Sequence, residues 1–135
     1  MDCLEEAIQS AGAISDRSTC AANSTAIGKG TERANVGKKA TFTIISRDSQ
    51  NRQRIQGGDV YAVKLKKSVN DLFGYNTTKV DVKDQNDGTY LAEYTVHHHY
   101  PSSLVGVSCR DYTLSVFLGG VHIKGSPFVV RVTRS

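Results

Sequence analysis

Apolar and polar residues alternate along much of this chain, which is the pattern of strands with one buried face. In the segment 39–47, for example, Ala40, Phe42 and Ile44 occupy every second position and threonines stand between them. This period, together with short apolar runs, predicts strands at 24–27, 39–47, 60–66, 79–83, 90–94, 112–118 and 121–132. We expect one core between the sheets to contain Phe42, Tyr90, Leu114, Val116 and Phe128.

Turn sequences separate the expected strands. Gly119-Gly120 can supply the positive φ angles of a two-residue hairpin, and the Asn-Asp-Gly sequence at 86–88 is a second hairpin signal, with Gly88 at the left-handed position. Ser126-Pro127 interrupts the last segment because proline has no N–H to donate. No alternation of strands with helices is visible. The sequence therefore predicts an all-β fold, a seven-stranded antiparallel immunoglobulin-like sandwich.

The first part of the chain has a different pattern. Leu4 and Ile8, with acidic residues between them, predict a short N-terminal helix over 2–10, and a linker rich in Ala, Ser and Thr follows. We expect residues 1–17 to form this helical and linker segment, with the end of a coiled coil among the alternatives, and residues 18–135 to form the sandwich. A secretory signal and an apolar run of about 20 residues are both lacking, so a cytoplasmic protein is expected.

The cysteines and the net charge narrow the function classes only slightly. Cys3, Cys20 and Cys109 are odd in number and lack CxxC spacing, which favours free thiols in a reducing compartment; a Cys20–Cys109 bridge is the alternative. The formal charge of +4 permits weak contacts with nucleic acids or acidic partners without demanding them.

Neither metal binding nor catalysis is indicated. Of His97, His98 and His99, only the first and third could converge from one strand face, and no carboxylate or thiolate stands at a ligand spacing, so we expect solvated histidines. No nucleophile motif frames Cys109, and the glycine pairs are not followed by helices that could hold a phosphate. We therefore expect no cofactor, no metal and no catalytic residues.

A basic segment raises the possibility of RNA contact. Arg47, Arg52 and Arg54 lie close together in sequence, with Lys38 and Lys39 nearby. Because the segment contains no aromatic residues on which bases could stack, a solvated strand end is the favoured interpretation and a weak RNA contact is the alternative.

Four motifs resemble those of a filamin-type, actin-binding-protein repeat. They are GKG at 28–30, GGD at 57–59, NDGTY at 86–90 and GGVHIKGSPFVVRV at 119–132. The resemblance implies one sheet of strands A, B, E and D and another of strands C, F and G. It also implies a non-enzymatic protein-interaction and spacer module of a larger protein. The N-terminal helix favours a tripartite-motif (TRIM) E3 ubiquitin ligase; the alternatives are a filamin rod repeat or an RNA-associated module of a TRIM-NHL-type translational repressor.

The resemblance implies partner binding by strand addition at the edge of strand C. Ala62, Lys64 and Lys66 would then face or flank the partner. Neighbouring domains of the same chain are alternative partners, and no membrane contact is expected. We expect the isolated domain to be a monomer and the parent protein to dimerise through a coiled coil.

Two loops, at 67–78 and 97–110, look longer than the family usually carries and are rich in apolar residues. Immunoglobulin-like topology places both at one end of the sandwich, so we expect them to meet. Phe73 and Tyr75 in the first loop are candidates for a contact surface, and a simple cap on the sandwich is the alternative.

Overall fold

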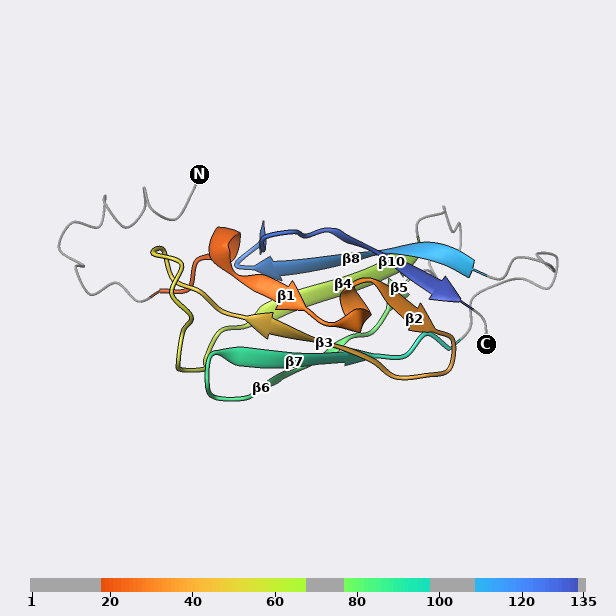
Figure 1. Cartoon of the computed structure of the whole chain (residues 1–135), viewed down its shortest axis with the longest axis horizontal. Coiled ribbons are helices and arrows are strands. Elements are labelled where there is room, and N and C mark those ends of the chain that lie inside the picture. Colours follow the sequence, from red (N-terminus) through yellow and green to blue (C-terminus); the bar gives the residue numbers. More distant parts are fainter. Residues whose placement is uncertain (1–17, 68–76, 98–108, 134–135) are drawn as a thin grey trace.

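The computed structural model describes residues 18–67, 77–97 and 109–133, which form two packed sheets (Figure 1). The first sheet has the order β1 (Thr25–Ile27), β3 (Ala40–Ile45), β7 (Thr89–Tyr94) and β6 (Asp81–Asp84). The second has the order β2 (Arg33–Asn35), β10 (Phe128–Thr133), β8 (Cys109–Leu118), β4 (Tyr61–Lys67) and β5 (Thr77–Thr78), and β9 (Val121–His122) also pairs with β8. This confirms the all-β immunoglobulin-like sandwich. Strands A, B, D and E are β1, β3, β6 and β7, whereas C, F and G are β4, β8 and the pair β9 and β10.

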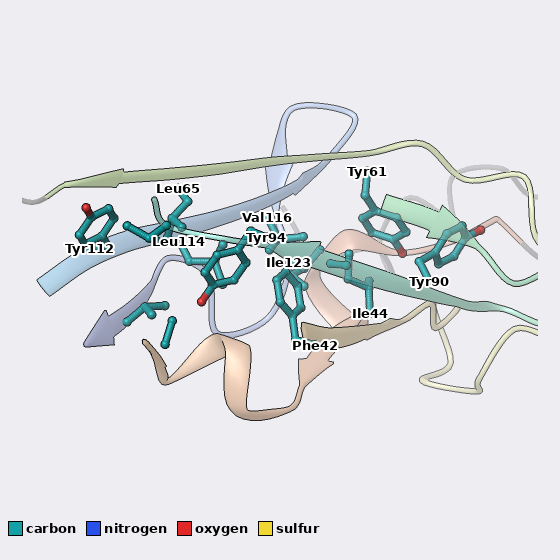
Figure 2. Close-up of a cluster of buried hydrophobic side chains, with 14 of the residues drawn as sticks. Phe42, Ile44, Tyr61, Leu65, Tyr90, Tyr94, Tyr112, Leu114, Val116 and Ile123 are labelled. Atoms are coloured by element: carbon teal, nitrogen blue, oxygen red, sulfur yellow. The ribbon is translucent and has the colours of Figure 1, made fainter. Parts of the chain in front are cut away.

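The core lies where the alternating apolar faces of the two sheets meet (Figure 2). Phe42, Tyr90, Leu114 and Val116 are all at most 2% exposed, as the sequence predicts. Phe128 is only half-buried: it packs at the margin of the core, close to Gly125. Phe128 thus joins the core at its edge, and the fully buried side chains of this strand are those of Val130 and Val132.

The chain changes sheets between its first two strands. After the short 3-10 helix η1 (Ala21–Asn23), β1 pairs antiparallel with β3. A second 3-10 turn, η2 (Lys29–Thr31), then leads into β2, which pairs in parallel with β10 in the other sheet (Figure 1). This crossing links the two sheets along one side of the sandwich.

Some features differ from the sequence-based expectations. β2 and β5 were not expected, because three and two residues without apolar alternation give no periodic signal. Cys20 is disulfide-bonded, so the expectation of free thiols was wrong for this residue. The alternative of a Cys20–Cys109 bridge is also wrong, because the two residues lie at opposite ends of the sandwich. The Cys20 N–H donates to the Arg47 carbonyl past the end of β3, whereas Cys109 pairs with Thr133 at the other end.

Two further expectations fall on parts of the chain outside the described residues. They are the helix over 2–10 and the meeting of the two long loops, whose segments 68–76 and 98–108 are not described. Within the described residues, no helix is both long and apolar enough to cross a membrane.

The turn between β6 and β7 has the geometry that the sequence predicts. Gly88 has φ of 90°, and a β-carbon there would lie 1.8 Å from the carbonyl oxygen of Arg54. Gly120 has a similar φ of 82°, but nothing lies within 4 Å of the same position. The two glycines thus share a backbone requirement and differ in packing.

We expect Gly88→Ala to lower the free energy of unfolding by roughly 2–4 kcal/mol, since left-handed strain and a clash with backbone add together. Gly120→Ala carries only the strain and should cost about 1 kcal/mol. Urea denaturation of both variants measures the difference. Equal losses would show that the contact with Arg54 relaxes without cost.

Candidate interaction surfaces

One edge of the second sheet is open along part of β4. Its neighbour β5 pairs only with Leu65 and Lys66, so among the described residues no strand lies beside the segment from Tyr61 to Lys64 on that side. An unpaired strand edge presents a row of main-chain donors and acceptors to any extended segment that reaches it.

The direction of the hydrogen bonds shows which residue of β4 offers these groups. The Val116 N–H donates to Ser126 Oγ (2.9 Å), and the Val116 carbonyl accepts from the Ile123 N–H (3.0 Å), so Val116 directs both groups away from β4. Val63 stands opposite Val116 in the antiparallel register. In such a non-bonded pair both residues point their polar groups outward. Val63 therefore directs its N–H and C=O to the open edge.

The residues singled out in the sequence flank this position. The side chains of Ala62, Lys64 and Lys66 are exposed on the outer face of the sheet. By the same alternation, the main-chain groups of Ala62 and Lys64 bond to β8, and Lys66 lies where β5 already covers the edge. Sequence reasoning missed Val63. Phe73 and Tyr75 lie outside the described residues.

A partly buried hydrogen-bond network fixes the start of β4. Asp59 Oδ2 accepts hydrogen bonds from Thr19 Oγ1 (2.5 Å) and Ser46 Oγ (3.0 Å). The main-chain N–H of Asp59 donates to the Tyr90 hydroxyl (2.9 Å). The Tyr61 hydroxyl lies 2.6 Å from Ser46 Oγ, and its ring packs edge-on against that of Tyr90 (Figure 2). Burial raises the pKa of both tyrosines, which remain neutral donors and acceptors at physiological pH.

The edge of the first sheet lies on the same side of the sandwich. Gly58, just before β4, donates its N–H to Asp84 Oδ2 at the end of β6 (2.8 Å). Val63 of β4, and Val80 and Val82 in and beside β6, are half-buried against the core. The open edge of β4 therefore borders a partly exposed apolar strip.

The basic residues that are close in sequence do not form one patch. Arg47 and Arg52 lie past the end of β3, where Arg52 Nε pairs with Asp48 Oδ2 at 3.1 Å. Burial acts to raise the Asp48 pKa, but hydrogen bonds from the main-chain amides of Arg52 and Gln50 and from the Arg52 side chain together hold this pKa below its usual range. Lys38 and Lys39 precede β3 and lie at its opposite end.

Lys38 and Lys39 border a groove that lies on the opposite side of the sandwich from the open edge of β4. This groove of about 570 Å³ lies around η2, between β1 and β3 of one sheet and β2 and β10 of the other. Its charged lining residues are Lys29, Arg33, Lys38, Lys39 and Arg131. Three of these were missed in the sequence because they come from separate segments that only the sheet-crossing turn brings together.

A tyrosine anchors the inner side of this groove. The Tyr94 hydroxyl, buried in the core, donates to the Gly30 carbonyl at 2.6 Å. A β-carbon at Gly30 would lie 2.6 Å from the Thr41 carbonyl oxygen, so η2 is pressed directly on β3. Burial raises the pKa of Tyr94 to about 12.

The histidines and carboxylates of the described residues form no metal site. His97 is exposed there, and no group of three or more potential ligands occurs in the same parts of the chain. His98 and His99 are outside them.

Comparison with known proteins identifies the domain. The sequence model of the Filamin/ABP280 repeat matches residues 18–129. The chain belongs to the filamin repeat family. The filamin repeat is a non-catalytic immunoglobulin-like domain. The crystal structure of the Lin-41 filamin domain is similar to this chain with a TM-score of 0.65, over 87% of this chain and 98% of that one. Because the two sequences are only 18% identical, this similarity concerns the fold alone.

Several curated relatives are tripartite-motif proteins. The E3 ubiquitin-protein ligase TRIM71 of Gallus gallus is 36% identical over 129 residues, which cover 96% of this chain and 13% of the relative. Tripartite motif-containing protein 3 of Rattus norvegicus is 30% identical over 134 residues, which cover 99% of this chain and 16% of that relative. The chain thus spans about one-seventh of the length of these relatives and corresponds to their filamin-type portion.

Removal of the Tyr94 hydroxyl tests the anchor beneath η2. Tyr94→Phe leaves the buried Gly30 carbonyl without this donor, and we expect it to lower the free energy of unfolding by about 1–3 kcal/mol at neutral pH.

The same variant has a defined pH dependence. Because the folded-state pKa of about 12 lies above the ordinary value of 10, Tyr94 contributes its full stabilisation below pH 10 and loses it progressively between pH 10 and 12. The stability difference between wild type and Tyr94→Phe should therefore be constant from pH 7 to 9 and shrink above pH 10 in urea titrations. A difference that stays constant to pH 11 would contradict the buried neutral phenol.

Proposed function

We propose that this filamin repeat is a protein-interaction and spacer module of a larger TRIM-type E3 ubiquitin ligase, and that it binds a partner segment as an added strand on β4. The observation that carries the proposal is the open main-chain edge at Val63. The TRIM relatives support the parent context over a filamin rod.

Main-chain pairing supplies affinity in this mode of binding, and alternate side chains supply selectivity. On the inner face, the added strand meets the half-buried Val63, Val80 and Val82. On the outer face it passes the exposed side chains of Ala62 and Lys64. The preferred partner is therefore an extended segment with apolar residues at every second position and acidic or neutral residues between them.

The positions of the chain ends support the spacer role. Thr19 bridges to Asp48 at the end of the sandwich where β3 finishes, whereas the Thr133 carbonyl accepts from the Val36 N–H at the end where β3 begins. The described chain thus enters and leaves at opposite ends along the strand direction. A domain with this arrangement separates its neighbours by its full length.

The test uses the 135-residue chain and a peptide selected from a random phage-displayed library. Val63→Pro removes the outward N–H, whereas the matched control Val63→Ala loses comparable apolar packing and keeps that donor. We expect Val63→Pro to abolish peptide binding and Val63→Ala to weaken it only modestly, with both variants folded by circular dichroism. Binding that survives Val63→Pro would exclude main-chain pairing at this edge.

Amide hydrogen exchange supplies a residue-level check. The Val63 amide should exchange fast in the free protein and become protected when the peptide binds, while the Lys64 amide, which bonds to β8, stays protected throughout. Protection that appears only elsewhere would assign the peptide to another surface.

A further inference from the structure

The groove around η2 is lined by one sign of charge. Its five cationic side chains come from η2, β2, the turn before β3, and β10, and no carboxylate lines it within the described part of the chain. The other polar lining side chains are those of Asn35, Thr41, Thr43 and Thr133. Concave surfaces with one sign of charge concentrate ligands of the opposite sign.

Two of the five cations are paired at the rim. Lys39 Nζ lies 3.4 Å from Glu93 Oε2, and Arg131 Nε lies 3.7 Å from Asp111 Oδ1. The side chains of both cations are about two-thirds exposed and those of Glu93 and Asp111 are 36% and 49% exposed, so a competing anion can replace the carboxylates at little cost. The exposed side chains of Lys29, Arg33 and Lys38 make no ion pair with other described residues.

We propose that this groove binds single-stranded RNA through its phosphates. Lysine, arginine, threonine and asparagine side chains are the groups that contact phosphate and sugar in nucleic-acid complexes, and they make up the polar lining here. The hydroxyl and amide groups of Thr41, Thr43 and Asn35 can also bond a ribose 2′-OH, which distinguishes RNA from DNA.

The composition of the groove disfavours a protein ligand. Protein interfaces are enriched in aromatic residues, methionine and arginine and depleted in lysine at their centres. Here three of the five cations are lysines, and Phe42, the one aromatic residue in the lining, is only 2% exposed. The volume of about 570 Å³ is that of a pocket for one drug-sized molecule, so the groove has room for a few nucleotides of a single strand. The lining has no exposed aromatic ring on which bases could stack, so the phosphate contacts must supply the affinity, and binding should be weaker than on a stacking surface and depend little on sequence.

The experiment measures binding of a fluorescein-labelled 12-nucleotide oligouridylate to the whole 135-residue chain by anisotropy at several salt concentrations. Three phosphate contacts give a slope of log affinity against log salt of about −2, which corresponds to a loss of roughly fifteen- to twentyfold between 50 and 200 mM salt. The triple variant Lys29→Gln, Arg33→Gln, Lys38→Gln should lose most of this affinity and most of the slope.

The control variant carries the same change of charge elsewhere. Lys64→Gln, Lys66→Gln, Lys83→Gln alters exposed lysines of β4 and β6 and should bind oligouridylate like the wild type. Thermal unfolding of both variants verifies that they fold.

Four outcomes would overturn the proposal. The first is absence of oligouridylate binding at 50 mM salt, and the second is an equal loss of affinity in the two triple variants. The third is equal affinity for the matching DNA strand. The fourth is a polyglutamate peptide that binds as tightly as oligouridylate or more tightly and whose binding the groove variant abolishes. The last outcome would assign the groove to an acidic protein. Because Val63→Pro lies across the sandwich, it should leave oligouridylate binding unchanged.

Discussion

The hydrogen bond from the buried Tyr94 hydroxyl to the Gly30 carbonyl holds the point where the chain passes from one sheet to the other. The absence of a side chain at Gly30 lets η2 lie directly on Thr41, so β1 can pair with β3 while β2 reaches β10. Both sheets gain a strand from one short stretch of chain. The cation-lined groove is a by-product of this crossing, because it lies around the turn that joins β1 to β2.

The sequence was sufficient for the sandwich because its main strands carry a strict period of two. In β3 and β7 nearly every second residue is buried, and the turn around Gly88 has the left-handed conformation that its residues favour. β2 and β5 were missed because they are too short and too polar for a period to be visible. Their strand conformation is imposed by the neighbouring strands β10 and β4.

The residue that directs its main-chain groups to the edge of β4 could not be read from the sequence, for a physical reason. The two-residue turn at Gly119-Gly120 indicates that Leu118 and Val121 form a bonded pair, so alternate residues of β8 face β9 and β10. Transferring that alternation to β4 requires the cross-strand register, in which Val63 stands opposite Val116. Two strands separated by a long stretch of chain do not reveal their register in the sequence, and a shift of one residue would have exchanged Val63 with Lys64.

The distribution of cations shows a similar limit. Arg47, Arg52 and Arg54 are neighbours in sequence, yet they lie past the end of β3, away from the groove, and the Arg52 side chain is paired with Asp48. The groove instead collects cations from segments as far apart in sequence as Lys29 and Arg131. Proximity along the chain is thus a poor guide to proximity on the surface of a sandwich.

The entry and exit of the described chain at opposite ends of the sandwich also determine how it would respond to mechanical load. Tension between Thr19 and Thr133 acts along the strands, and β10 is held on one side by β8 and on the other by β2. The antiparallel bonds run perpendicular to the strand, so they are loaded in shear and must yield together instead of opening one after another. Tension applied at these two points would therefore meet the combined resistance of both ladders of β10.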